Sequence, residues 1–321
     1  MSDLPKSVHI FEQGTREGFQ FEKGPIPTAR KIELVDALSR TGLKQIQVCS
    51  FVPAKNVPGM ADADEVARGF TAYAGVKYEA LVLNEKGLER ALSFGRFDMT
   101  GTISQTASEA FLARNQKRTF EQNFEAQHRM VEMYKEHGVT VDKGSIMAAF
   151  GCNFQGDISV ERVLEVCQGI FDIAAEHDLA IKVLNLSDTM AWATPESLKR
   201  VVGAVRDKYP EQRLSLHLHD TRGMAVALAY AGLEMGVDMY DSCVAGLGGC
   251  PFAAHKGAAG NICTEDLVFM CEEMGIDTGV DLDRMIEAAR LAEEIVGHDL
   301  PGSVMRGGTL RALRERARTA A

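Results

Sequence analysis

Eight short apolar runs alternate with longer segments of helical periodicity, and this alternation constrains the fold more than any other feature of the chain. The segments with an apolar residue every three or four positions include 28–41, 160–176, 195–207, 224–235 and 281–296. In the first of them, Ile32, Val35 and Leu38 share one face. Strands that are joined by helices pair in parallel. The predicted strands are 8–12, 45–51, 78–83, 97–103, 140–149, 180–186, 213–219 and 237–244.

Eight strand–helix units in a chain of 321 residues favour one closed (β/α)8 barrel over an open doubly wound sheet or two domains. We therefore predict an α/β fold, a TIM barrel over residues 1–280, followed by a C-terminal helical extension over 281–321 that packs on the barrel. The extension ends in an Arg-rich helix that starts at Thr309. Its arginines can serve to bind a phosphate, but a solvated helix packed on the barrel is the favoured interpretation.

The composition excludes several classes of protein. With 45% hydrophobic and 25% charged residues, the chain is neither low-complexity nor largely disordered. Lys plus Arg is 35 and Asp plus Glu is 45, and the resulting net charge of −10 gives no support to a nucleic-acid partner. No apolar run approaches the ~20 residues of a membrane span, and no signal peptide is evident at the start. The seven cysteines contain no CxxC pair, which indicates reduced thiols and a cytoplasmic location.

Two histidines in a predicted strand are the sharpest local feature. His217 and His219 are two residues apart, so their side chains point to the same side of the strand, ~6.5 Å apart at Cα. Leu216 and Leu218 then face the outer helices. Paired imidazoles at the carboxyl end of a barrel strand favour a divalent metal site. The alternative is a pair of structural histidines.

Oxygen donors follow other predicted strands. Arg16 and Glu17 lie in a glycine-flanked turn after the first strand, Asp188 follows the sixth, and Asn261 follows the last. A carboxylate and an amide oxygen can complete the metal shell, while Arg16 can bind a substrate oxygen. Taken singly, each has a structural alternative: a loop salt bridge for Arg16 and Glu17, and a helix N-cap for Asp188.

A glycine-rich loop after the last strand carries one thiol. Residues 246–249 lead into Cys250, and such a loop can close over a site while the thiol acts as an acid or base. A phosphate-holding turn is the alternative. The other six cysteines are expected to be buried as small hydrophobic residues.

Together these segments resemble the 3-hydroxy-3-methylglutaryl-CoA lyase family of metal-dependent barrel lyases. The resemblance covers about residues 8–287 and is carried by GTREGFQ at 14–20, SFVP at 50–53 with VPGMAD at 57–62, SDT at 187–189, HLHDT at 217–221, AGLGGCP at 245–251, GN at 260–261 and TEDLV at 264–268. The cysteine-containing glycine loop is the specific part, and the paired histidines occur more widely.

The resemblance implies a role for each candidate residue. His217, His219 and Asn261 match metal ligands, and Glu17 stands where the family has an Asp ligand. The catalytic residues it implies are Arg16, which stabilises the developing enolate oxygen, Cys250, which transfers a proton, and Asp188 and His217 as acid–base partners. The residues expected near the substrate are Gln20, Gln47 and Ser50.

The resemblance also implies an activity. The expected enzyme is an oxo-acid-lyase that cleaves 3-hydroxy-3-methylglutaryl-CoA to acetyl-CoA and acetoacetate with Mg²⁺ or Mn²⁺, the metals suited to oxygen-rich ligation with two histidines. Its partners would be the acyl-CoA substrate and a second copy of the chain in a homodimer.

Three departures from the family pattern leave alternatives open. Glu17 is one methylene longer than the usual Asp, Gln47 replaces a usual Glu, and the loop from Cys250 to Asn261 carries about two extra residues. These departures are compatible with a lyase for a different 3-hydroxyacyl-CoA. A Claisen-type synthase of the same superfamily is disfavoured, because those relatives have Glu and Arg where Cys250 and Pro251 stand. A catalytically inactive barrel is the remaining alternative.

Overall fold

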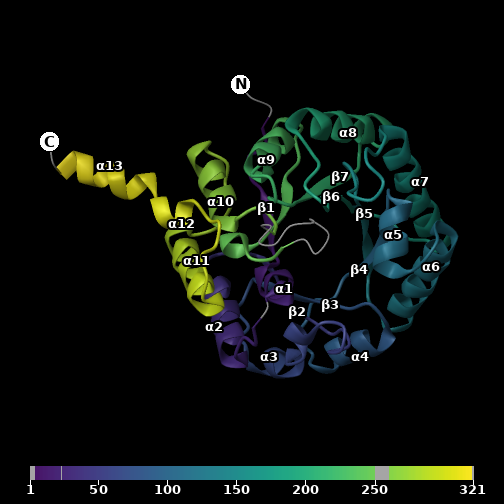
Figure 1. Cartoon of the computed structure of the whole chain (residues 1–321), viewed down its shortest axis with the longest axis horizontal. Coiled ribbons are helices and arrows are strands. Elements are labelled where there is room, and N and C mark those ends of the chain that lie inside the picture. Colours follow the sequence, from purple (N-terminus) through teal and green to yellow (C-terminus); the bar gives the residue numbers. More distant parts are fainter. Residues whose placement is uncertain (1–3, 23, 250–259, 320–321) are drawn as a thin grey trace.

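The computed structural model describes residues 4–22, 24–249 and 260–319, which form a parallel eight-stranded sheet surrounded by helices (Figure 1). The order of neighbouring strands is β3-β2-β1-β8-β7-β6-β5-β4, so the first and last strands of the chain pair with each other inside the sheet. The predicted TIM-barrel-like α/β fold is confirmed. The strands are β1 His9–Glu12, β2 Gln45–Ser50, β3 Lys77–Leu81, β4 Gly101–Thr106, β5 Val141–Met147, β6 Val183–Asp188, β7 Arg213–Leu218 and β8 Met239–Ser242.

All eight predicted strands are present, and β4 shows the largest displacement. It was predicted from residue 97 but starts at Gly101. Residues before it form the seam to β3 instead: the Asp98 N–H donates to the Tyr78 carbonyl at 2.7 Å, and the Asp98 carboxylate accepts the Tyr78 N–H at 3.0 Å. Phe97 packs edge-on against Phe51. Within the described chain, no strand ladder joins β3 to β4. The predicted closed barrel therefore has a seam here, which Asp98 bridges with one backbone and one side-chain hydrogen bond to Tyr78.

The helices lie outside the sheet, and their bounds follow the predicted periodicity closely. Helix α7 spans the predicted residues, with the Ser159 hydroxyl accepting the Arg162 N–H at its start. Helix α8 starts with Pro195 after the cap Thr194. The helices that follow the strands are α2 Thr28–Ser39, α3 Ala63–Gly69, α4 Glu85–Ser93, α5 Glu109–Gln116, α6 Phe120–Glu136, α7 Val160–Glu176, α8 Pro195–Lys208, α9 Ala225–Glu234 and α10 Thr264–Glu273, with short turns η1 Gly14–Gly18, α1 Phe19–Phe21, η2 Pro58–Met60 and η3 Val244–Gly246.

The C-terminal segment contains α11 Leu282–Val296, α12 Val304–Gly307 and α13 Leu310–Thr319. Helix α11 lies between α10 and α2 in the outer ring, whereas α13 extends away from it (Figure 1). Arg314 of α13 binds Glu273 of α10 at 2.7 Å, and Arg311 binds Asp283 of α11. These ion pairs use two of the arginines for internal contacts. The domain boundary at residue 280 stays a prediction.

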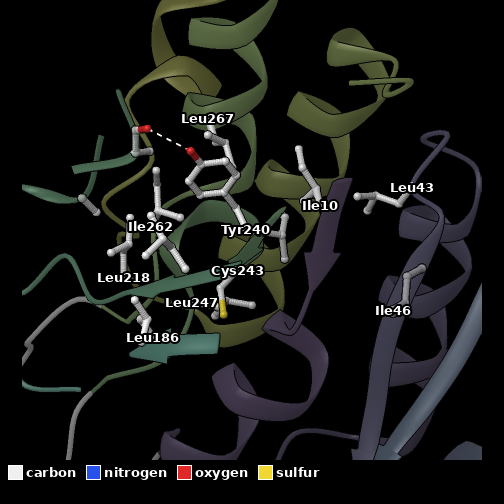
Figure 2. Packing of buried hydrophobic residues seen from close by; sticks show 14 of the residues in the cluster. Ile10, Leu43, Ile46, Leu186, Leu218, Tyr240, Cys243, Leu247, Ile262 and Leu267 are labelled. Carbon is white, nitrogen blue, oxygen red and sulfur yellow. Dashed lines mark hydrogen bonds between the residues drawn. The ribbon is translucent and has the colours of Figure 1, made fainter. Parts of the chain in front are cut away.

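The main core lies between the strands and the outer helices. Tyr240 of β8 is buried there among Leu218, Ile262 and Leu267, and its hydroxyl donates to the carbonyls of Ala229 and Val237 at 3.1 Å (Figure 2). Six of the cysteines are buried free thiols, as predicted: Cys49, Cys152, Cys167, Cys243, Cys263 and Cys271. Among the described residues, no helix has the length and apolar character needed to cross a membrane.

A buried carboxylate ties the first strand to the segment after the last. Glu12, at the end of β1, accepts the Gly14 N–H at 2.7 Å and the Val244 N–H at 2.9 Å through one oxygen. Its other oxygen accepts the Thr264 hydroxyl. A Cβ on Gly14 would lie 2.7 Å from this carboxylate, so only glycine fits the turn. Burial raises the pKa of Glu12 to about 7, although the three hydrogen bonds act to lower it.

This pKa predicts how stability depends on pH. The carboxyl pKa is about 7 in the folded chain and near 4.5 when exposed, so the folded state binds a proton that the unfolded state releases. The free energy of unfolding therefore falls as the pH rises from about 4.5 to about 7. In the Glu12→Gln variant, the free energy of unfolding should fall less than in the wild type as the pH rises, by up to ~3 kcal/mol. The measurement is urea unfolding at pH 5 and pH 8 with a chelator present.

The control is Glu132→Gln, at an exposed position of α6. It should unfold with the wild-type pH dependence. Equal pH dependence in the wild type and Glu12→Gln would show that the buried carboxylate is ionised throughout this range.

Candidate metal centre

Because the strands are parallel, their carboxyl ends lie at one edge of the sheet, and most of the predicted site residues belong to it. Turn η1 follows β1 and carries Arg16 and Glu17. His217 is near the end of β7, and His219 follows it. Asn261 lies beside His219 through an isolated backbone bridge. The structure therefore brings together residues from segments far apart in the sequence, including the four candidate ligands Glu17, His217, His219 and Asn261.

Three of these residues present ligand atoms to one point. Nε2 of His217 lies 3.0 Å from Nε2 of His219. Oε1 of Glu17 lies 3.4 Å from the His219 nitrogen and 3.8 Å from the His217 nitrogen. In an octahedral shell with bonds of about 2.1 Å, neighbouring ligand atoms are about 3.0 Å apart. The separation of the two histidine nitrogens matches this value and the two distances to Glu17 are longer, so the three atoms lie close enough together to bind one divalent cation.

Asn261 supplies a fourth candidate donor. Its side chain is fully buried, and its amide nitrogen donates to Sγ of Cys243 at 3.3 Å. Its Oδ1 atom is buried and accepts no hydrogen bond from the described part of the protein. A buried amide oxygen without a donor is costly unless another group binds it, so the residue fits a metal-ligand role.

The charges of the site suit a cation as well. Burial acts to raise the pKa of Glu17, but Arg16 and both histidines outweigh it and hold that pKa far below its usual value. Burial lowers the pKa of His217, but the charges of Glu17 and Asp241 and the hydrogen bond that His217 donates to Asp241 raise it overall. The site thus holds an ionised carboxylate next to two imidazole nitrogens.

Arg16 is held beside this centre by three side chains. Its Nε donates to Oε1 of Gln47, and its guanidinium also donates to Gln13 at 2.9 Å and to Glu17 at 3.0 Å. Two of the three acceptors are neutral amides. The guanidinium is therefore fixed in orientation while only one carboxylate offsets its charge.

The predicted substrate-binding residues differ in their surroundings. Gln47 contacts Arg16, as described. Ser50, at the end of β2, is fully buried, and its hydroxyl has no hydrogen-bond partner among the described residues. Gln20 lies in α1, which packs on η2, and takes no part in the described hydrogen bonds that join Arg16, Glu17 and the histidines.

Asp188 is present at the end of β6 but is engaged with the backbone. Its two oxygens accept the N–H groups of Trp192 at 2.7 Å and Ala193 at 3.0 Å. Burial raises its pKa, which these hydrogen bonds and His219 act to lower. Asp188 therefore shapes the turn after β6, but the alternative prediction of a helix N-cap is wrong, because Thr194 caps α8. Cys250 lies outside the described residues.

Asp241 is a site residue that the sequence interpretation missed. Its Oδ2 lies 3.0 Å from Nδ1 of His217. The parallel register places the two residues opposite each other, since His217 of β7 pairs with Asp241 of β8. Aligning the starts of the two predicted strands, at residues 213 and 237, would have placed this carboxylate opposite His217.

Known proteins with similar sequences and structures share this architecture. The HMGL-like family model matches residues 7–292. The mitochondrial hydroxymethylglutaryl-CoA lyase of Rattus norvegicus is 39% identical over 288 residues, which cover 90% of this chain and 85% of the relative.

Two solved structures are similar along nearly their whole length. Hydroxymethylglutaryl-CoA lyase from Pseudomonas aeruginosa superposes with a TM-score of 0.86 at 38% identity, covering 95% of this chain and 98% of the other. An HMG-CoA lyase from Acinetobacter baumannii, in complex with coenzyme A and 3-methylmalate, gives a TM-score of 0.84 at 35% identity and covers 96% and 97%.

The family match spans the strands, the candidate metal ligands and most of α11. The predicted resemblance is thereby confirmed over the segment on which it was based. The chain belongs to the HMGL-like family.

Proposed function

We propose that this protein is a divalent-metal-dependent carbon–carbon lyase that cleaves 3-hydroxy-3-methylglutaryl-CoA, or a close analogue, to acetyl-CoA and a keto acid, acetoacetate for that substrate. The observation that carries the proposal is the convergence of Glu17, His217 and His219 next to Arg16. The relatives that bear the same activity in their names match the chain over 90% of its length.

The ligand set supports Mg²⁺ or Mn²⁺ as the metal. Glu17, His217, His219 and Asn261 would hold it, and a divalent cation supplies the positive charge that lowers the pKa of a substrate hydroxyl. Two nitrogen and two oxygen donors leave room for substrate oxygens in an octahedral shell. No thiolate is among the described candidate ligands, which separates this site from structural zinc sites.

Arg16 acts on the thioester side of the reaction. Cleavage of the C2–C3 bond leaves the enolate of acetyl-CoA, and its oxygen is stabilised by a cation fixed in advance. Gln47, Gln13 and Glu17 hold the guanidinium in one orientation before substrate binds. The neutral amide of Gln47 keeps the positive charge of Arg16 available to an anionic partner.

Proton transfer is assigned to Cys250, with Asp188 and His217 as partners. Cys250 delivers a proton to the enolate carbon from the glycine-rich loop. The raised pKa of Asp188 suits a proton carrier. Its carboxylate also holds the N–H groups of Trp192 and Ala193, so Asp188→Asn should disturb this turn as well as proton transfer.

A different 3-hydroxyacyl-CoA is the second candidate substrate. The longer side chain of Glu17 and the neutral Gln47 change the space and charge at the metal. The Acinetobacter baumannii relative contains coenzyme A and 3-methylmalate, and a shorter hydroxydicarboxylate of that type would suit such a change.

The cellular setting completes the proposal. The buried free thiols support a reducing, cytoplasmic location. The acyl-CoA substrate and a homodimer are the proposed partners, and Gln20 and Ser50 are the proposed substrate contacts besides Gln47. Residues 1–280 and 281–321 are the proposed barrel domain and extension.

The test of the activity is acetyl-CoA release from a panel of 3-hydroxyacyl-CoAs. The purified protein should release acetyl-CoA with Mg²⁺ or Mn²⁺, lose the activity with EDTA and regain it when metal is restored. His219→Ala should lose both metal binding and turnover, whereas His298→Ala, which alters an exposed ion pair with Glu22, should lose neither. No release from any member of the panel would rule out the lyase.

The role of Arg16 is tested separately. Arg16→Gln should lower kcat by about 10²–10³-fold, the usual cost of removing one preorganised oxyanion donor, while the affinity for Mn²⁺ stays within a few-fold. The control is Arg213→Gln, which removes an exposed ion pair with Asp238. A wild-type kcat in Arg16→Gln would contradict the assignment.

A further inference from the structure

Asp241 lies opposite His217 on the neighbouring strand and contacts the ring nitrogen that faces away from the candidate metal centre. The two side chains are equally buried, each with about a seventh of its surface exposed (14%). Nδ1 of His217 is 3.0 Å from Oδ2 of Asp241, while Nε2 faces His219 and Glu17. The two nitrogens of one imidazole therefore serve two different partners.

The contact determines which nitrogen of His217 carries a proton. A carboxylate oxygen can only accept, so Nδ1 must be the donor. Nε2 is then the nitrogen with the lone pair in the neutral ring, and this is the nitrogen that points toward the other ligands. A neutral imidazole binds a metal through that lone pair.

A chain of hydrogen bonds holds Asp241 in turn. Asn185 of β6 donates through Nδ2 to Asp241 at 3.3 Å and to the Ser215 hydroxyl at 2.9 Å. The Ser187 hydroxyl donates to Oδ1 of Asn185 at 2.8 Å, which fixes the orientation of the amide. The chain runs from β6 to β8 and ends at His217.

The described contacts of Asp241 favour a role at His217 over a purely structural role in the barrel. The hydrogen bonds of this carboxylate within the described residues go to His217 and to the neutral Asn185. The nearby Lys143 binds Glu79 instead, at 3.1 Å, and Asp241 acts unfavourably on Glu79 by raising its pKa. A largely buried carboxylate without a permanently charged partner is destabilising, so its place beside His217 favours a role at that histidine over a role in stability.

We propose that Asp241 is the positioning residue of the metal centre: it holds His217 with the proton on Nδ1 and the lone pair of Nε2 toward the metal, and Asn185 keeps Asp241 in place. The inference rests on the metal site of the proposed function but not on the reaction itself. Partners of this kind orient metal-binding histidines, and their loss typically costs 10–100-fold in metal affinity.

The test is Mn²⁺ affinity without substrate, measured by electron paramagnetic resonance, together with the ¹⁵N shifts of His217 in the metal-free protein at a pH alkaline enough for the ring to be neutral. In Asp241→Ala, Mn²⁺ should bind about 10–100-fold more weakly, and the proton of His217 should no longer be confined to Nδ1. Asp241→Asn should recover part of the affinity, because an amide oxygen in the place of Oδ2 still accepts from Nδ1. Asp238→Ala, which alters an exposed pair with Arg213 just before β8, is the matched control and should bind Mn²⁺ normally.

Two results would overturn the inference. One is unchanged Mn²⁺ affinity and unchanged ¹⁵N shifts in Asp241→Ala. The other is an equal loss of Mn²⁺ affinity in Asp241→Ala and Asp241→Asn while the proton of His217 stays on Nδ1. Asp241 would then act only through the attraction of its charge for the cation. If Asp241→Ala does not fold, Asn185→Ala, which frees Asp241 but leaves it in place, should weaken Mn²⁺ binding by several-fold, and unchanged affinity would overturn the proposal.

The experiment also separates this inference from the proposed function. A wild-type protein that binds no Mn²⁺ would refute the metal site, while the ¹⁵N shifts of the metal-free variants would still test the hold of Asp241 on His217. A protein that binds Mn²⁺ but releases no acetyl-CoA would refute the lyase and leave the inference intact.

Discussion

The buried carboxylate of Glu12 is the interaction on which the geometry of the site depends most. It joins the turn that carries Arg16 and Glu17 to the segment after β8 and to the start of α10, next to Asn261. The first and last strands are far apart in sequence, but this side chain holds their ends together without a cation. A carboxyl group whose pKa is about 7 makes this junction sensitive to pH near neutrality.

The whole molecule is acidic, whereas the site presents the positive charge of Arg16 and a ligand set for a cation. The chain has a net charge of −10, which by itself would repel an anionic acyl-CoA. At the carboxyl ends of the strands, Arg16 is held by two neutral amides and one carboxylate, and the ligand set is suited to a divalent cation. The excess of acidic residues elsewhere favours solubility, so the net charge says little about the substrate.

Periodicity and spacing predicted much of the fold and the metal ligands. Helix α7 was placed at its observed residues from the periodicity of its apolar positions, and Ser159 caps it in the structure. His217 and His219 were paired because alternate residues of a strand share a side. The seam at Asp98, the backbone contacts of Asp188 and the contact between Asp241 and His217 were not predicted, since each depends on how separate segments lie next to one another.

The sequence by itself determined the order of strands and helices, the family, and the residue types from which a metal site can be made. The order of strands and helices follows from the periodicity of residues a few positions apart, and the family and the residue types follow from short motifs. Only the tertiary structure decided that Glu17 meets two histidines about two hundred residues away, that Gln47 holds Arg16, and that Asp241 orients His217. Strand register and barrel curvature set these distances, and both arise from packing across the whole sheet.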